Sequence, residues 1–388
     1  MSADNKQPVL GILGGGQLAR MLALAAAPLG VKTVVFDGSA DVCAGDVSPL
    51  VVAPWDDFSA LETFAKKVDV VTFDFENVPA ETARWLAERV AVFPSPHALA
   101  VAQDRIVEKN TFRECGIKTA PFVAVDTRED LTKALATIGA PAILKTRRFG
   151  YDGKGQFRLK TLADADAAWA ELGAPAAEHG LILEGFVPFQ RELSVIAVRG
   201  RDGEFRTWPL TQNWHTNGVL AMSLAPARDI EQLQQRATEL ARTLAERLDY
   251  VGVFALELFV KDGELLGNEM APRVHNSGHW SIEGAHTSQF ENHVRAVMGL
   301  PLGDTAARGV SAMFNWVGGL PDVAPMLRTV DAHWHDYGKA PRPGRKVGHA
   351  TLCAPDTKQL FARLDAVAQA LHREAQAAPA LEALRDHP

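Results

Sequence analysis

Residues 253–280, VFALELFVKDGELLGNEMAPRVHNSGHW, decide the fold of this chain because they predict two short strands joined at Asp262-Gly263. We expect one face of the first strand to carry the alternate apolar residues Phe254, Leu256, Leu258 and Val260. Glu257 interrupts this apolar run. Burying an unpaired charge is costly, so a carboxylate in the middle of such a strand needs a partner.

Glu269 follows twelve residues later and is the natural candidate for a shared site with Glu257. A loop with an odd number of residues, such as three with Gly263 left-handed, would put both carboxylates on one face. A strict two-residue turn would put them on opposite faces. Two carboxylates on one face repel each other unless a proton or a cation lies between them, and Mg²⁺ fits best. The alternative is a partly exposed hairpin with two solvated acids.

A polar loop follows this hairpin directly after Pro272. It packs five polar side chains into seven residues, namely Arg273, His275, Asn276, Ser277 and His279. Functional residues concentrate on loops that a rigid scaffold positions, so this stretch reads as a site loop. An ordinary surface loop would explain poorly why these residues adjoin the acidic pair.

Length and composition exclude several classes of protein. The 388 residues suggest two or three domains, and the net charge of −7 argues against bulk attraction to nucleic acid or anionic membranes. No apolar run approaches the roughly 18 residues that span a bilayer, and the polar start lacks a signal-peptide core. Three widely spaced cysteines, at 43, 115 and 353, favour neither a disulfide framework nor a zinc site. We therefore expect a cytoplasmic protein.

The N-terminal segment predicts a strand over 9–13, a helix over 17–27 and a strand over 33–36, which implies a parallel sheet. Gly14-x-Gly16-x-x-Ala19, followed by Asp37, also fits a loose dinucleotide fingerprint. An NAD(P)-dependent oxidoreductase is therefore a rival hypothesis, although such a turn can hold any anionic group. Glu76 follows a predicted strand over 68–73, where ligands of open α/β sheets bind.

The middle of the chain suggests a phosphate site. Lys145 ends a predicted strand over 142–145, and the flexible loop 150–156, GYDGKGQ, could wrap a polyphosphate although it lacks a Walker A ending. A helix predicted over 103–115 carries Asp104, Arg105 and Lys109, whose charges we expect mostly on a solvated face.

Three further polar residues are candidates for nucleotide contacts. Glu184, in the strand and connector over 181–187, could accept a hydrogen bond from a base amine, and Glu192 opens a strand where a ribose could lie. His215 lies between apolar runs and gains weight only from its neighbours. A long amphipathic helix is expected over 230–248, directly before the acidic hairpin.

Five motifs together resemble the ATP-grasp superfamily, and within it the family of 5-(carboxyamino)imidazole ribonucleotide synthetases. They are GGGQLARM at 14–21, QDR at 103–105, GYDGKGQ at 150–156, NEMAPRVHNSGHW at 268–280 and YGKAPRPGRKVGH at 337–349. The resemblance implies ATP- and bicarbonate-dependent carboxylation of the amine of 5-aminoimidazole ribonucleotide in purine biosynthesis. Many members of the superfamily have Asn two residues after the second metal glutamate, whereas this chain has Ala271, which leaves two clear protein ligands.

The resemblance also implies the architecture and the partners. We expect an α/β ATP-grasp fold with a Rossmann-like N-terminal domain over 1–100, an ATP-grasp domain over 101–298 and a C-terminal domain over 299–388. The ATP-grasp domain would carry a mobile lid over about 119–187. ATP and Mg²⁺ are the expected cofactors, and a homodimer that binds neither nucleic acid nor membrane is the expected form. Another ATP-grasp ligase, a formate-using transferase and a nucleotide-sensing regulator remain alternatives.

The family's site residues carry over by position. The implied metal ligands are Glu257 and Glu269. The implied nucleotide contacts are Arg105, Lys145, Gly150, Tyr151, Asp152, Gly153, Lys154, Gly155, Gln156, Glu184, Gly185, Phe186, Val187, Glu192, His215 and Asn268. The implied substrate contacts are Gln17, Glu76, Lys339, Arg345 and Lys346, and the implied catalytic residues are Tyr151, Asp152, Arg273, His275 and Lys346. Asp152 is the first candidate for the proton acceptor and His275 the second.

Overall fold

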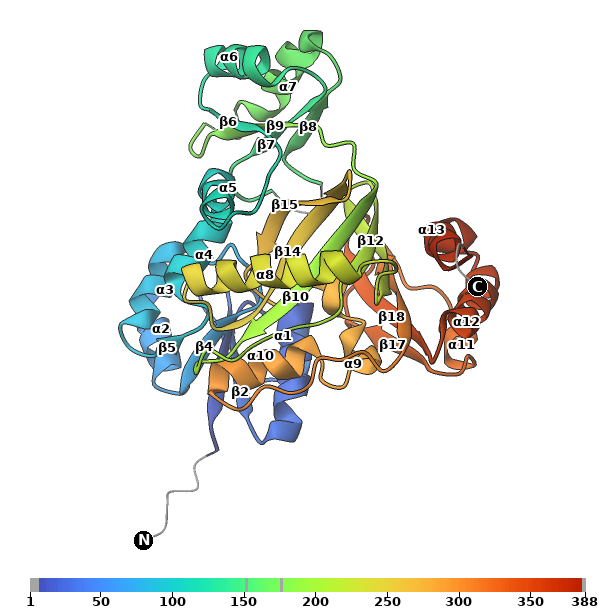
Figure 1. Ribbon diagram of the computed structural model, residues 1–388. Coiled ribbons are helices and arrows are strands. Elements are labelled where there is room, and N and C mark those ends of the chain that lie inside the picture. The colour runs from blue at the N-terminus through green and yellow to red at the C-terminus, as the bar shows by residue number, and fades with distance from the viewer. Residues whose placement is uncertain (1–6, 151–152, 175–176, 386–388) are drawn as a thin grey trace.

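The computed structural model describes residues 7–150, 153–174 and 177–385, and its strands form three sheets (Figure 1). A parallel sheet lies near the N-terminus, a small antiparallel sheet forms the upper lobe of Figure 1, and a large sheet runs through the rest of the molecule. The α/β architecture confirms the fold class predicted from the sequence. The domain boundaries at 100 and 298 stay a prediction.

The N-terminal sheet has the strand order β3-β2-β1-β4-β5, and every neighbouring pair is parallel. Its helices connect parallel strands, as a βαβ arrangement requires. The predicted strand over 9–13 and the predicted start of the first helix at Gln17 are confirmed. The elements are β1 (Val9–Leu13), α1 (Gln17–Ala26), β2 (Lys32–Asp37), β3 (Leu50–Val52), α2 (Phe58–Ala65), β4 (Val70–Phe73), α3 (Ala80–Ala87) and β5 (Ala91–Val92).

The upper lobe is an antiparallel sheet of order β6-β9-β7-β8 with its own apolar core. Helices α6 and α7 pack on the sheet through leucine and alanine side chains. That it moves as a lid stays a prediction. The elements are β6 (Phe122–Val125), α6 (Arg128–Ile138), β7 (Ala142–Thr146), β8 (Gln156–Leu159), α7 (Ala165–Leu172) and β9 (Leu181–Gly185).

The large sheet has the order β15-β14-β10-β12-β13-β16-β18-β17, with β11 paired to β10. Helix α8 covers one face of its first half, and α12 and α13 pack on its second half, which confirms the predicted helical tail (Figure 1). The strands are β10 (Arg191–Arg199), β11 (Phe205–Thr207), β12 (Thr211–Thr216), β13 (Val219–Ala225), β14 (Gly252–Lys261), β15 (Glu264–Ala271), β16 (Val310–Val317), β17 (Ala332–Asp336) and β18 (Lys346–Ala354). The helices are α8 (Glu231–Arg247), α9 (Ser281–Gly284), α10 (Gln289–Met298), α11 (Ala324–Leu327), α12 (Thr357–Ala370) and α13 (Glu374–Arg385).

The β14–β15 hairpin corrects the argument about its turn. Lys261 pairs with Glu264 across a strict two-residue turn, in which Asp262 and Gly263 both have positive φ (53° and 77°). The alternation of side chains between the two faces of the hairpin nevertheless shifts by one residue away from the turn, because Glu257 pairs with Glu269 while Leu258 pairs with Gly267. The one extra residue between these partners, a β-bulge, brings both carboxylates to the same face. An odd-numbered loop is therefore not what aligns the acidic pair.

The helix predicted over 103–115 is broken at Asp104, which ends α4 (Pro96–Gln103) and caps α5 (Arg105–Glu114). The Asp104 carboxylate accepts the backbone N–H groups of the next helix's first turn at 3.0 and 3.3 Å. The prediction that the charged residues of this helix lie mostly on a solvated face is wrong, because Glu108 and Lys109 are only 2 % and 1 % exposed. Both side chains point into the protein, where they need partners.

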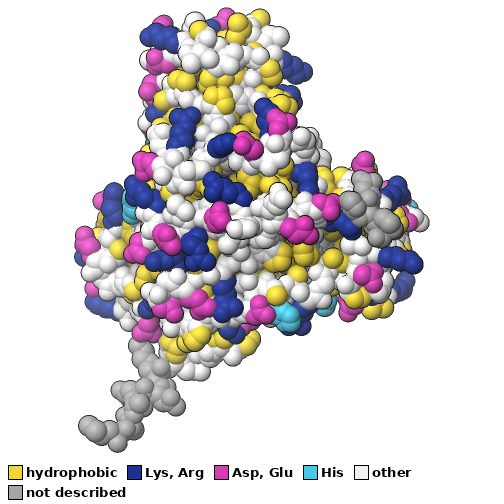
Figure 2. Space-filling model, in the orientation of Figure 1, with side chains coloured by type: hydrophobic (Ala, Val, Ile, Leu, Met, Phe, Trp, Pro, Cys, Tyr) yellow, Lys and Arg dark blue, Asp and Glu magenta, His cyan; other side chains and the backbone are white. Residues whose placement is uncertain are grey.

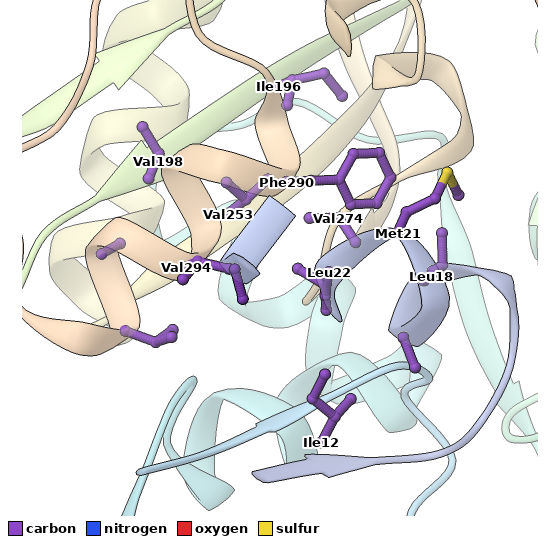
Figure 3. Packing of buried hydrophobic residues seen from close by; sticks show 14 of the residues in the cluster. Ile12, Leu18, Met21, Leu22, Ile196, Val198, Val253, Val274, Phe290 and Val294 are labelled. Atoms are coloured by element: carbon purple, nitrogen blue, oxygen red, sulfur yellow. The ribbon is translucent and has the colours of Figure 1, made fainter. Parts of the chain in front are cut away.

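Helix α1 joins the N-terminal sheet to the large sheet through a shared apolar core (Figure 3). Leu18 and Leu22 of α1 lie between Ile12 of β1 and the side chains of Phe290 and Val294 on α10. Burying such side chains contributes roughly 1.5–3 kcal/mol each, so this core fixes the two sheets relative to each other.

Buried His293 on α10 makes a second connection between these sheets. Its Nδ1 accepts the backbone N–H of Val253 at 3.0 Å, which leaves the proton on Nε2, 2.7 Å from the Thr72 hydroxyl of β4. Burial lowers the pKa of His293 to about 3. Protonation would place a second donor against the Val253 N–H, so the contact requires a neutral ring.

We expect acid to weaken the fold through His293 well before carboxylates titrate. Between its usual pKa of about 6.5 and about 3, only the unfolded chain takes up the proton, so the free energy of unfolding falls as the pH falls. From pH 7.5 to 5.5 this loss is about 1.4 kcal/mol. Urea unfolding of the wild type and of His293→Gln at both pH values tests this. The difference in free energy of unfolding between the wild type and His293→Gln should shrink by about 1.4 kcal/mol from pH 7.5 to 5.5. Equal changes in both proteins would contradict the role of His293.

The surface mixes charges of both signs on the face shown in Figure 2. Lys and Arg side chains alternate there with Asp and Glu, and neither sign of charge dominates this face. That the protein binds no nucleic acid stays a prediction. Within the described ranges, no helix combines the length and the apolar character needed to cross a bilayer.

Candidate active site

A cleft of about 800 Å³ lies where the three sheets meet. Gln17 and Glu76 reach it from the N-terminal region, Lys145 and Gln156 from the upper lobe, and Arg345 from the loop before β18. Its walls carry charged groups of both signs, which suits a charged ligand better than an apolar one. The structure thus brings many of the predicted nucleotide and substrate residues around one opening.

The acidic pair lies on the floor of this cleft. Arg105 donates to Glu269 at 2.8 Å, and His275 Nε2 lies 3.1 Å from an oxygen of Glu257. Burial raises the pKa of Glu269, but Arg105 and Lys145 outweigh it and hold that pKa at about 2. Both carboxylates sit on one face of the hairpin, as the pairing of β14 with β15 requires.

This arrangement fits a divalent cation whose other ligands come from a bound phosphate. The described residues contain no group of three or more His, Cys, Asp or Glu side chains placed to enclose a metal. Mg²⁺ commonly binds one or two carboxylates and completes its shell with phosphate oxygens and water. The donor set at Glu257 and Glu269 therefore fits Mg²⁺ bound to a nucleotide rather than a closed metal cage.

A cavity of about 50 Å³ adjoins the cleft beneath the upper lobe and is lined by the predicted nucleotide connector. The aromatic rings of Phe189 and Phe259 stack beside it, with centroids 4.5 Å apart. Its lining includes the predicted connector and the bulge region of β15, namely Lys109, Ala120, Ile143, Lys145, Glu184, Gly185, Phe186, Val187, Phe189, Phe259, Gly267 and Asn268.

Glu184 is the charged centre of this pocket and is only 4 % exposed. One of its oxygens lies 3.0 Å from Lys145 Nζ and 3.4 Å from Lys109 Nζ. Burial raises the Glu184 pKa, but the two lysines lower it further and leave it at about 2. The other oxygen is buried without a hydrogen-bond partner in the described part of the chain, so it can accept from a base amine.

Glu192 and His215 form a pair on neighbouring strands β10 and β12. His215 Nδ1 lies 2.6 Å from the Glu192 carboxylate, and both line the cleft. Burial lowers the pKa of His215, but the bond to Glu192 outweighs it and the net pKa is raised. The sequence predicted both as nucleotide contacts, and the structure brings them together.

Two residues that hold the hairpin were missed by the sequence argument. Glu108 accepts the backbone N–H of Met270 at 2.7 Å, and Lys109 donates to the carbonyl of Asn268 at 2.8 Å. These bonds lie on either side of Glu269, so helix α5 is hydrogen-bonded to the backbone of the bulged segment both before and after this residue. Burial raises the pKa of Glu108 to about 8 and lowers that of Lys109. Their spacing of three and four residues from Arg105 places all three on one helix face and was the available signal.

We expect Lys109→Met to lower the free energy of unfolding by about 3 kcal/mol and to weaken ATP binding, because it removes one member of a buried charged group. Urea denaturation and a nucleotide titration measure the two effects. Lys118→Met is the matched control. Lys118 also pairs with a residue of β15, Glu264, but its side chain is 64 % exposed. An exposed pair contributes at most about 1 kcal/mol. Equal losses in both variants would contradict the role of Lys109.

The glycine-rich turn at 14–16 does not support the dinucleotide hypothesis. The Gly15 N–H donates to Asp37 at 2.8 Å, and the Gly16 N–H donates to Asp74 at 2.7 Å. A ribose-binding acid would have to be free to face its ligand, whereas the Asp37 carboxylate is bound to the turn itself. Asp74 also accepts from the Ala19 N–H at 2.8 Å, and burial raises its pKa.

The end of the cleft near Lys339 brings together residues from distant parts of the chain. Arg273 donates to Glu76 at 2.5 Å, and Lys339 donates to the side-chain oxygen of Gln17. Arg345 and Lys346 line the same end. Of the loop 150–156, Gly150, Gly153, Lys154 and Gln156 line the cleft, while Gly155 (φ 68°) carries the turn into β8. Tyr151 and Asp152 lie outside the described residues.

The fold and the site together define an ATP-grasp ligase. The family model described as an ATP-grasp domain matches residues 110–290, a ribonucleotide synthetase preATP-grasp domain matches 8–103, and a phosphoribosylaminoimidazole carboxylase C-terminal domain matches 311–363. The chain belongs to the family of N5-carboxyaminoimidazole ribonucleotide synthases.

Relatives of known name support this assignment over nearly the whole chain. It is 51 % identical to the N5-carboxyaminoimidazole ribonucleotide synthase of Pseudomonas aeruginosa, over 92 % of this chain and 97 % of the relative. The crystal structure of the synthetase from Thermus thermophilus matches with 53 % sequence identity and a TM-score of 0.88. The match covers 93 % of this chain and 98 % of the Thermus chain. The crystal structure of the Aspergillus clavatus enzyme, solved with ADP and 5-aminoimidazole ribonucleotide, matches with 31 % sequence identity and a TM-score of 0.86. The match covers 95 % of this chain and 99 % of the Aspergillus chain.

Proposed function

We propose that this chain carboxylates the amine of 5-aminoimidazole ribonucleotide with ATP and bicarbonate, giving 5-(carboxyamino)imidazole ribonucleotide, ADP and phosphate in purine biosynthesis. One observation carries the proposal. The bulged hairpin presents Glu257 and Glu269 on the floor of a cleft that runs from the cavity beside Glu184 to the basic loop before β18. A nucleotide bound along this cleft would place its phosphates over the two carboxylates.

The nucleotide would bind with its base under the upper lobe. The free oxygen of Glu184 would accept from the base amine, and Glu192 would contact the ribose. Lys145 and Lys154 would face the phosphates, where their charge is needed. Glu257 and Glu269 would hold Mg²⁺, which when bound neutralises phosphate charge and polarises the transferred group.

The reaction needs negative charge to be stabilised at one place. An oxygen of bicarbonate would attack the γ-phosphorus and ADP would leave, which forms carboxyphosphate. Arg105 and Lys145 would stabilise the charge that gathers there, and positioning would supply most of the remaining rate enhancement. Carboxyphosphate would release CO₂ and phosphate inside the cleft, where closure of the upper lobe would exclude water.

The substrate amine would then attack CO₂ and lose one proton. Asp152 is our first candidate for the acceptor, and His275 is the second, while the family resemblance assigns Tyr151 and Arg273 to the same chemistry. The phosphate of the ribonucleotide would lie against Lys339, Arg345 and Lys346, beside the N-terminal end of α1 at Gln17.

We expect phosphate release from ATP to require both bicarbonate and the aminoimidazole ribonucleotide. Phosphate would be assayed with each component omitted in turn, with NADPH absorbance followed alongside. Removing CO₂ and bicarbonate should reduce product formation to background. Product driven by formate instead would replace carboxylation with formyl transfer, hydride transfer without ATP use would favour an oxidoreductase, and binding without turnover would favour a regulator.

We also propose that the chain works as a cytoplasmic homodimer. The cysteines at 43, 115 and 353 are all unpaired, as expected in a reducing compartment. Light scattering during size-exclusion chromatography measures the mass directly. A mass of about 42 kDa, that of one chain, would contradict the dimer.

A further inference from the structure

A buried chain of hydrogen bonds crosses the large sheet and ends at His275. The Ser223 hydroxyl donates to Asn213 Oδ1 at 2.8 Å, and Asn213 Nδ2 donates to the Ser194 hydroxyl at 3.0 Å. Ser194 donates to the Ser277 hydroxyl at 2.7 Å, which lies 2.8 Å from His275 Nδ1. The first four side chains are at most 5 % exposed, so bulk water does not compete for these bonds.

The direction of this chain follows from its end at His275. The backbone N–H of Ser277 can only donate, and it points at His275 Nδ1 at 3.4 Å. Nδ1 is therefore an acceptor, and the Ser277 hydroxyl donates to it as well. The Ser277 oxygen is then left to accept from Ser194, whose own oxygen accepts from Asn213. Only this direction uses each hydrogen once without placing two donors face to face.

The backbone of His275 is fixed independently of its ring. Gln289 accepts the His275 N–H at 2.9 Å and donates to the His275 carbonyl at 2.6 Å. Gln289 is fully buried, and a side chain at Gly278 would lie within 2.6 Å of it. The ring can therefore turn only about its own side-chain bonds, and the hydrogen-bond chain decides which nitrogen faces the cleft.

We propose that Ser277, Ser194, Asn213 and Ser223 are positioning residues that hold the proton of His275 on Nε2. Nε2 lies 3.1 Å from Glu257, at the floor of the cleft. His275 therefore presents an N–H donor to the carboxylate and to the oxyanions that form beside it, while its lone pair on Nδ1 is taken. Such partners set the tautomer of a functional histidine.

This inference rests on the proposed function only for its catalytic consequence. With Nδ1 occupied and Nε2 protonated, His275 has no free lone pair facing the substrate amine. His275 would then stabilise charge on carboxyphosphate, and Asp152 would be left as the candidate acceptor of the amine proton.

The tautomer can be read directly by long-range ¹H–¹⁵N NMR of protein labelled at its histidines, with His275→Gln used to assign the signal. Without nucleotide or substrate, Nδ1 of His275 should have a pyridine-like shift and Nε2 a pyrrole-like shift. Ser277→Ala removes the shorter of the two bonds to Nδ1 and keeps the longer one from the backbone N–H, so it should move both shifts part of the way toward the opposite tautomer. Ser194→Ala should move them less, and Ser223→Ala least. Ser311→Ala removes an equally buried hydroxyl of the same sheet outside the chain and should change nothing.

A pyrrole-like Nδ1 in the wild type, or equal shifts in Ser277→Ala and Ser311→Ala, would overturn the proposal. For the reaction, Ser277→Ala should lower kcat about 10-fold, as loss of such a partner commonly does. The NMR signals are recorded without substrates, so they test the tautomer even if the proposed carboxylation fails. Conversely, normal carboxylation with the wrong tautomer would reject the positioning role alone.

Discussion

Replacing Glu269 with glutamine is expected to reduce ATP hydrolysis by about 1000-fold or more while the protein stays folded. A metal ion supplies several kcal/mol of charge stabilisation to a reacting phosphoryl group, and each 1.36 kcal/mol is tenfold in rate. The glutamine keeps the shape and can still accept the hydrogen bond from Arg105 at 2.8 Å. The substitution removes one of the two negative charges, those of Glu257 and Glu269, that would bind a cation on this face of the hairpin.

Three measurements make this prediction decisive. Phosphate release gives the rate, calorimetric titration of Mg²⁺ in the presence of ADP gives the metal affinity, and circular dichroism reports the fold. Glu264→Gln is the matched control on the same strand, because its carboxylate pairs with exposed Lys118 away from the cleft. Wild-type turnover in Glu269→Gln with intact secondary structure would remove the metal assignment.

The second large effect concerns the basic loop before β18. Losing a charge-assisted hydrogen bond costs roughly 1.5–3 kcal/mol, so Arg345→Ala should weaken binding of aminoimidazole ribonucleotide about 10- to 100-fold. ATP binding should change far less. The truncation removes one side-chain bond within the loop, from Arg345 to the Ala340 carbonyl at 3.3 Å, but keeps the backbone bonds from Arg345 N–H to Arg342 and from Gly318 N–H to Arg345. Adding Lys346→Ala should weaken binding further but not additively, because both cations would serve one phosphate.

Calorimetric titration with each ligand separately tests this second prediction. Arg236→Ala is a suitable control, because Arg236 is a 55 % exposed arginine of α8, where it pairs with Glu239. A surface substitution of that kind changes free energies by at most about 0.5 kcal/mol. Unchanged affinity for the ribonucleotide in Arg345→Ala, or an equal loss for ATP, would move the basic loop out of the substrate site.

The sequence alone predicted several of the elements and named candidate residues for the site. Alternating apolar residues around Glu257 predicted a buried strand, and the apolar runs at 9–13 and 181–187 predicted others, because side-chain periodicity is a local property. The motifs carried the family and therefore the substrates. Lys145, which the sequence places at the end of a strand, and Arg345, which the family resemblance implies, both line the cleft.

Only the tertiary structure decided how those residues meet. A two-residue turn should have placed Glu257 and Glu269 on opposite faces, and the bulge between them reverses that outcome. The bulge is held by Glu108 and Lys109 of α5, more than 150 residues away, so no local pattern could reveal it.

The same reason applies to the histidine of the site loop. Its neighbours in sequence show that His275 is polar and near the acidic pair, but not which nitrogen carries its proton. That is set by Ser194, Asn213 and Ser223, which reach it only because strands β10, β12 and β13 lie side by side in one sheet. A hydrogen bond depends on distances of about 3 Å between atoms, and such distances exist only once distant strands have paired.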